Sequence, residues 1–284
     1  MTILKSSPPQ QPGFKLSAWQ VLVFIAAAAT AWGLDFAAQT AFPLANAVPY
    51  LVNTMITLII VLSLGKASSY LLKQSGLPFD ALGLKLSRET LFNILSGLVI
   101  GTVTVALLMA GLYVFNPFRL TAGNLHGLAL LKACYWYLLN NSIEELMFRG
   151  FLLIVLIKVF DWRRAVLIMA LPFGLFHLPY LGFTMAGLKM VLTTAVLSFV
   201  FGYAFVLTRS LYTAIAVHVS MNILNHALLG IDGAGHAAYA PVFSNPWPTD
   251  YDAGFIVTIL VGAVMAGVLY LMIDLRDKTG AAGT

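Results

Sequence analysis

The sequence has few charged residues and a single cysteine. Charged side chains make up 10% of the 284 residues, whereas soluble domains carry about a quarter. Hydrophobic residues make up 60%, and the mean hydropathy is +0.89. A soluble core cannot hide this apolar excess, so the sequence predicts an integral membrane protein and excludes disorder and nucleic-acid binding. With Cys134 alone, an intrachain disulfide and a zinc site built on cysteines are also excluded.

Several apolar runs are long enough to cross a bilayer, which takes about 20 helical residues. They lie at about 18–42, 48–71, 91–115, 128–160, 164–180, 187–208, 211–229 and 255–273. We therefore predict an all-α polytopic membrane protein with about eight transmembrane helices. Residues 1–16, which are rich in Pro and Ser, are predicted to be a disordered cytoplasmic tail. Residues 17–275 are predicted to form one membrane domain, and residues 276–284 a short cytoplasmic tail.

The basic residues predict the orientation. If both termini are cytoplasmic, the outer side holds Arg119, Lys132 and Lys189, against thirteen Lys and Arg residues on the inner side. This distribution obeys the positive-inside rule. The net charge of +5 is therefore interpreted as a topology signal and not as a nucleic-acid surface.

Two adjacent carboxylates lie inside an apolar helix pattern. Glu144 and Glu145 are two of the three glutamates of the chain, and a charge at membrane depth indicates a functional site. Arg149 is four residues after Glu145, so these two share a helix face and can pair. Glu144 lies about 100° round the helix and is free to face an interior cavity. The structural alternative is that both carboxylates pair with cations across a helix interface.

Two histidines are also ionisable residues inside predicted membrane spans. His177 follows Phe173 by four residues, and His218 precedes Asn222 by four. A lone membrane histidine is often an interhelical hydrogen bond. However, a rise of about 1.5 Å per residue puts Glu144 and both histidines within the roughly 30 Å bilayer core. Three spans therefore bring Glu, His, His and Asn toward one buried site, which suits hydrolysis by activated water with donors for an oxyanion.

The ordered pattern resembles the CPBP family of intramembrane proteases. It reads Glu144-Glu145-x-x-x-Arg149, Phe173-x-x-x-His177 and His218-x-x-x-Asn222. The family includes type II CAAX prenyl endopeptidases, Abi bacteriocin-related proteins and proteins similar to a lysostaphin-resistance protein. The resemblance covers a core at about 128–225 and implies eight helices around a buried polar catalytic cavity that opens toward the cytoplasm.

The resemblance also implies roles for these residues. Glu144 would be the general base with His177 beside it, while His218 and Asn222 would hold water or the oxyanion. The supporting residues would be Glu145, Arg149 and Phe173. The family has been described both as glutamic-type and as metallo-type proteases. Zinc on Glu144, His177 and His218 is therefore an alternative, although we favour the metal-free glutamate mechanism.

The predicted function is that of an intramembrane endopeptidase. It would hydrolyse a peptide bond in a membrane-anchored protein or peptide within the lipid bilayer, in a bacterial plasma membrane, and would have no nucleic-acid partner. A non-catalytic membrane immunity or scaffold protein of the Abi type is the alternative. An ion-coupled transporter is disfavoured, because many transporters are built from repeats and the sequence shows none.

Overall fold

The structure is a computed structural model that describes residues 14–41, 47–78, 80–230, 237–244 and 250–281. Its helices are α1 (Ala18–Ala41), α2 (Ala47–Gln74), α3 (Arg88–Phe115), α4 (Leu128–Glu145), α5 (Phe151–Val159), α6 (Trp162–Phe176), α7 (Leu178–Leu181), α8 (Met185–Thr208), α9 (Leu211–Asn222) and α10 (Asp250–Ala281). Two π-helical segments, η1 (Leu146–Gly150) and η2 (Ile223–Leu228), directly continue α4 and α9. The strands are β1 (Phe118–Ala122) and β2 (Tyr239–Phe243).

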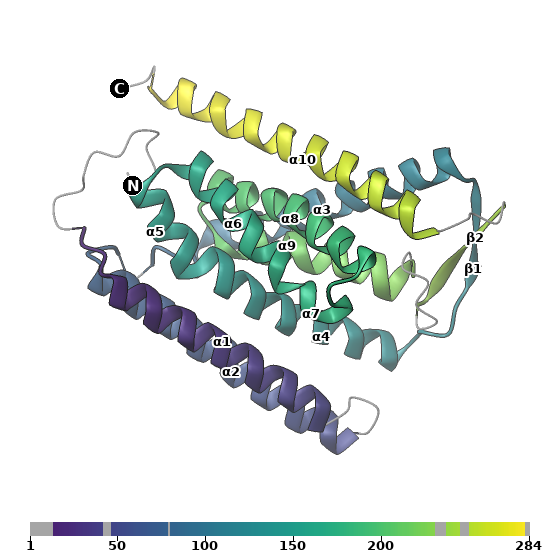
Figure 1. The fold of residues 1–284 in the computed structure, drawn as a ribbon, viewed down its shortest axis with the longest axis horizontal. Coiled ribbons are helices and arrows are strands. Elements are labelled where there is room, and N and C mark those ends of the chain that lie inside the picture. The colour runs from purple at the N-terminus through teal and green to yellow at the C-terminus, as the bar shows by residue number, and fades with distance from the viewer. Residues whose placement is uncertain (1–13, 42–46, 79, 231–236, 245–249, 282–284) are drawn as a thin grey trace.

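The helices form an elongated bundle. The α1–α2 hairpin runs along one side, α10 runs along the opposite side, and the other helices lie between them (Figure 1). Antiparallel strands β1 and β2 form a small ribbon at the end remote from both termini, in a register that pairs Phe118 with Phe243. The ribbon apart, the architecture is helical, so the prediction of an all-α polytopic membrane protein is confirmed.

Six helical segments of the described chain are long and apolar enough to cross a membrane. They are Ala18–Ala41, Tyr50–Gln74, Arg88–Phe115, Trp162–Leu181, Met185–Thr208 and Gly254–Thr279. The other two predicted spans, at 128–160 and 211–229, coincide with α4–η1–α5, which a π-helical turn divides, and with α9–η2, which ends in one. The count of eight therefore stays a prediction, whereas integration into the membrane is supported by the six spans.

The outward surface of these helices is apolar. Phe92, Leu171, Leu192 and Leu260 are among the many large hydrophobic side chains that are at least half exposed. A soluble protein would not leave such a surface in water, and a bilayer covers it. The predicted N-terminal tail lies almost entirely outside the described residues, and α10 continues through residue 276 to Ala281, past the predicted end of the membrane domain.

Two glycines let α3 approach α9 closely. A Cβ at Gly97 would collide with Ala216, and a Cβ at Gly101 would collide with Ser220 and Val217. Small residues spaced four apart are a common means of bringing membrane helices together. These two glycines allow α9, which carries His218 and Asn222, to pack closely against α3.

Candidate active site

The deepest part of the site is a cluster around Glu145. Its Oε1 atom accepts hydrogen bonds from Arg149 Nη1 at 3.2 Å and from His218 Nδ1 at 2.9 Å. The exposed fractions of the three side chains are 0% for Glu145, 1% for Arg149 and 6% for His218. The Glu145–Arg149 pair that the helix spacing predicts is therefore present, and His218 joins it from α9. A carboxylate in such a place needs these partners, because an isolated buried charge is costly.

Arg149 is held by two further elements. Its Nη2 donates to the main-chain oxygen of Ser198 at 3.2 Å and to the Ser198 hydroxyl at 2.8 Å, both on α8. The guanidinium carbon lies 4.2 Å from the Phe173 ring centroid and 5.1 Å from that of Phe201. Cation–π contacts of this kind are strongest where water is excluded. Arg149 thus ties η1 to α6 and α8 with one side chain.

Glu144 occupies a different environment from its neighbour. Its Oε2 atom lies 3.7 Å from His177 Nε2, and the two side chains are 18% and 14% exposed. The same Oε2 is itself buried and has no hydrogen-bond partner in the described part of the chain. The Glu144 and His177 side chains are nevertheless partly exposed, whereas the Glu145 side chain is sealed.

The proton on His177 is fixed by its own helix. His177 Nδ1 lies 2.8 Å from the main-chain oxygen of Phe173, and since a carbonyl only accepts, Nδ1 is the donor. In the neutral imidazole, Nε2 is then an acceptor that faces the acceptor oxygens of ionised Glu144. Two acceptors 3.7 Å apart do not bond to each other. A water molecule beside them can donate one hydrogen to each.

Asn222 lies with a neighbouring asparagine instead of with His218. Its Nδ2 donates to Asn141 Oδ1 at 3.0 Å, and this contact joins α9 to α4. Asn141 Nδ2 is buried without a partner among the described residues. His218 and Asn222, four residues apart on α9, thus bond to Glu145 and Asn141, which are four residues apart on α4.

Phe173 lies at the centre of the site. Its ring centroid is 5.0 Å from that of His177 and 6.1 Å from that of His218. Phe201 stacks on His218 with centroids 4.4 Å apart and an interplanar angle of 17°. These rings separate the two histidines and fix the plane of each imidazole.

Both helices that supply the site change to a π-helix at it. Segment η1 begins directly after Glu145, and η2 begins directly after Asn222. A π-helical turn bonds each residue to the fifth along instead of the fourth, which shifts the side-chain register, and such turns are frequent at functional sites. The hydropathy of both runs predicted uninterrupted helices, and the two π-helical turns correct that prediction.

Other residues of the candidate site belong to no motif that the sequence reveals. Ser198 and Phe201 lie on α8, in an apolar run without a motif. They enter the site because α8 packs against α6 and α9. Asn141 had a signal, since it is a polar residue inside the apolar run beside the two glutamates.

The residues present form a poor zinc site. Zinc in proteins takes at least three side-chain ligands, and no three His, Cys, Asp or Glu side chains of the described chain converge to hold a metal. Of the proposed set, Glu144 and His177 lie together. His218 instead directs its Nδ1 atom to Glu145.

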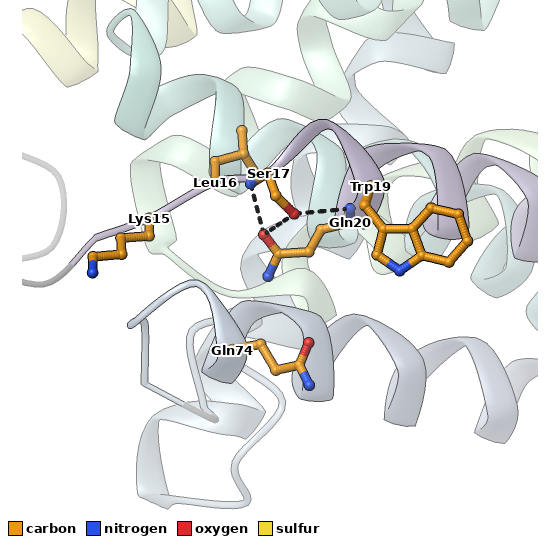
Figure 2. Close-up of a pocket in the computed structure, with 6 residues that line it drawn as sticks. All are labelled: Lys15, Leu16, Ser17, Trp19, Gln20 and Gln74. Atoms are coloured by element: carbon orange, nitrogen blue, oxygen red, sulfur yellow. Dashed lines mark hydrogen bonds between the residues drawn. The ribbon is translucent and has the colours of Figure 1, made fainter.

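An open pocket also lies at the start of α1, outside the three motifs. It is lined by Lys15, Leu16, Ser17, Trp19, Gln20 and Gln74 (Figure 2). The Gln20 amide is used within the wall, because its oxygen accepts from Ser17 at 2.9 Å and its nitrogen donates to Ser75 at 3.1 Å. This pocket therefore shares no residue with the candidate site.

Comparison with known families supports the resemblance of the three motifs. Residues 126–224 match the family described as Type II CAAX prenyl endopeptidase Rce1-like. The matched segment runs from just before α4 to just after Asn222, so it holds both glutamates, both histidines and Asn222. No curated protein matches the chain. Over residues 126–224 the protein is therefore similar to the type II CAAX prenyl endopeptidases, which supports its resemblance to the CPBP family and, in general terms, an intramembrane CAAX-type protease.

Proposed function

We propose that the protein is an intramembrane endopeptidase in which Glu144 is the general base. The observation that carries this proposal is the contrast between two adjacent carboxylates. Glu145 is fully buried and bound by Arg149 and His218. Glu144 is partly exposed and faces a histidine acceptor 3.7 Å away. Only a carboxylate that reaches water can take a proton from it.

The reaction would follow from these positions. A water molecule between Glu144 and His177 gives a proton to Glu144 while its oxygen attacks the substrate carbonyl carbon. A C–O bond forms, and the carbonyl oxygen becomes an oxyanion, to which His218 and Asn222 donate hydrogen bonds. The C–N bond then breaks, and Glu144 returns the proton to the leaving amine. Such proton transfer contributes about 10²–10⁴ in rate.

Glu145 and Arg149 would hold the donor side of the site. A protonated His218 gives one N–H to Glu145 and has the other for the oxyanion. The Glu145 carboxylate accepts from His218 Nδ1 at 2.9 Å, and Arg149 keeps Glu145 in place from η1. We propose the metal-free form of the mechanism, because the described residues bring Glu144 together with one histidine and not with two.

The substrate would be a membrane-anchored protein or peptide, since the site lies among apolar helices. Cleavage of a prenylated tail is the activity in the name of the matched family. We propose a bacterial plasma membrane as the location, with both termini in the cytoplasm, from the distribution of Lys and Arg. One membrane domain would then include the motif core and the flanking helices.

Terminal proteomics tests this function. Membranes from cells that carry the native chain are compared with membranes that carry Glu144→Gln or Glu89→Gln at matched levels. Glu89 is the matched control, because it is the third glutamate and lies in the first turn of α3. We expect new protein termini with the native chain and with Glu89→Gln, and none with Glu144→Gln.

A peptide that spans the mapped cleavage site then gives rates with purified protein, and a farnesylated peptide with a CAAX tail tests the substrate class. Glu144→Gln is expected to lower kcat about 10²–10⁴-fold. Full activity of this variant would refute the proposed mechanism. Identical termini in all three samples, with the biological effect retained by Glu144→Gln, would favour the immunity or scaffold function.

A further inference from the structure

A second buried carboxylate lies outside the three motifs. Asp35 on α1 is 6% exposed and has no cation within ion-pair distance among the described residues. It accepts a hydrogen bond from Thr57 Oγ1 on α2 at 2.9 Å and another from Gln39 Nε2 at 2.6 Å. Asp35 lies within the first apolar run of the sequence. An ionisable residue at this depth indicates a functional site by default.

The Asp35 cluster reaches the candidate active site through one amide. Gln39 Nε2 also donates to Asn140 Oδ1 on α4 at 3.1 Å, and Asn140 Nδ2 donates to the main-chain oxygen of Trp136. Asn140 lies four residues before Glu144, so the two share a face of α4. Asp35 therefore faces the Glu144 side of the site.

The four side chains of this cluster differ in burial. Asp35 and Thr57 are buried, whereas Gln39 and Asn140 are half-buried. Inside a bilayer, an extended peptide needs a partner for each main-chain N–H and C=O. Because Asp35 and Asn140 take both N–H groups of Gln39, the Gln39 oxygen is left as an acceptor, and Asn140 keeps a second N–H as a donor. Gln39 and Asn140 are thus suited to bind the main chain of a peptide one helical turn from Glu144.

We propose that Gln39 and Asn140 form a subsite for the main chain of an extended peptide substrate, and that Asp35 is the positioning residue that orients their amides. This inference rests on the proposed function, because it places the substrate beside Glu144. Asp35 accepts only, so it keeps the Gln39 nitrogen directed at both Asp35 and Asn140. Asn140 must then present its oxygen to Gln39 and its nitrogen to Trp136.

The donors and acceptors around Asp35 predict which variants keep the Gln39 and Asn140 amides in these orientations. In Asp35→Asn, the new amide oxygen can accept from Gln39, and the new amide nitrogen can donate to Thr57. The Thr57 hydroxyl can then donate to Asn53 Oδ1, which lies 3.4 Å away. Asp35→Asn is therefore expected to keep the subsite, whereas Asp35→Ala leaves Gln39 without its anchor.

The test measures kcat and KM separately for the peptide that spans the mapped cleavage site. Gln39→Leu and Asp35→Ala should each raise KM about tenfold, which equals about 1.4 kcal/mol of binding, with kcat unchanged. Asp35→Asn should keep the native KM. Gln74→Leu is the matched control for Gln39, because this exposed amide contacts Tyr70.

Thr57→Val separates a positioning role from mere stabilisation of the α1–α2 hairpin. It removes the α2 contact of Asp35 and leaves the Gln39–Asn140 contact, so its melting temperature should fall while KM stays native. A native KM for Gln39→Leu would overturn the subsite, and Gln39→Leu decides the question if Asp35→Ala does not fold. A loss of kcat in Asp35→Asn as large as in Glu144→Gln would make Asp35 a charged catalytic group and overturn its positioning role.

Failure of this inference can be told apart from failure of the proposed function. If the function fails, Glu144→Gln cleaves at the native rate or no peptide is cleaved by any sample, and the subsite falls with it. If the subsite alone fails, Glu144→Gln is inactive and the KM of Gln39→Leu equals that of the native chain.

Discussion

Glu144 and Glu145 are adjacent in the chain, but they face different surroundings. Glu145 is fully buried and accepts hydrogen bonds from Arg149 and His218. Glu144 is 18% exposed and lies 3.7 Å from His177. The helix itself produces this difference, because consecutive side chains point about 100° apart. The proposed roles, a reactive Glu144 and a structural Glu145, rest on this difference.

The buried Glu145–Arg149 pair should control stability. Glu145→Gln leaves the Arg149 charge buried with a weaker partner, and breaking such a pair costs about 3–5 kcal/mol. The measurement is denaturant unfolding in detergent micelles. The exposed arginine of the Arg164–Asp161 pair provides the control, and Arg164→Gln should cost about 0–1 kcal/mol.

A double variant sharpens this prediction. Glu145→Leu with Arg149→Met removes both buried charges together, so it should cost less than either single change. Equal losses for the double variant and for Glu145→Gln would show that the charge pair is not what stabilises this region.

The two histidines should respond differently to truncation. His177 is partly exposed and bonds to its own helix, so His177→Ala should lower kcat about 100-fold with little change in melting temperature. His218→Ala should lower both, because His218 stacks on Phe201 and bonds to Glu145. The exposed His126 is the control for both. A native kcat for His177→Ala would contradict the proposed water site.

The contact between α3 and α9 should tolerate no added methyl group. Gly101→Ala would drive a Cβ into Ser220 and Val217 on α9, and overpacking of this kind costs about 1–3 kcal/mol. Both the melting temperature and the rate should fall, since α9 carries His218. Gly33→Ala, where a Cβ meets nothing within 4 Å, should leave both unchanged. Equal behaviour of the two variants would mean that the close helix contact is unimportant.

Removal of divalent metal should leave the peptidase active. The metal-free mechanism needs Glu144 and His177 to activate water, and the described residues bring no three metal ligands together. The measurement is cleavage of the mapped peptide after treatment with a membrane-permeable chelator, together with the zinc content of the purified protein. Stoichiometric zinc, with activity lost on chelation and restored by zinc, would establish the metallo-type mechanism instead.

The sequence predicted the fold class because its cause is compositional. Long apolar runs with little charge exclude a soluble fold. The runs at 128–160 and 211–229 show where this reasoning reaches its limit. Hydropathy does not reveal the π-helical turns η1 and η2, because they depend on how the side chains on either side pack.

The sequence also determined which residue types gather at the site, and the spacing of Glu145 and Arg149 predicted their pair, since both lie on one helix. The partners of His218 and Asn222 were decided by tertiary structure alone. His218 and Asn222, four apart on α9, bond to Glu145 and Asn141, four apart on α4, and local spacing does not encode which face of which helix they meet. The same holds for Ser198 and for the bond from Gln39 to Asn140. These contacts join helices far apart in the chain, and only packing determines which faces meet.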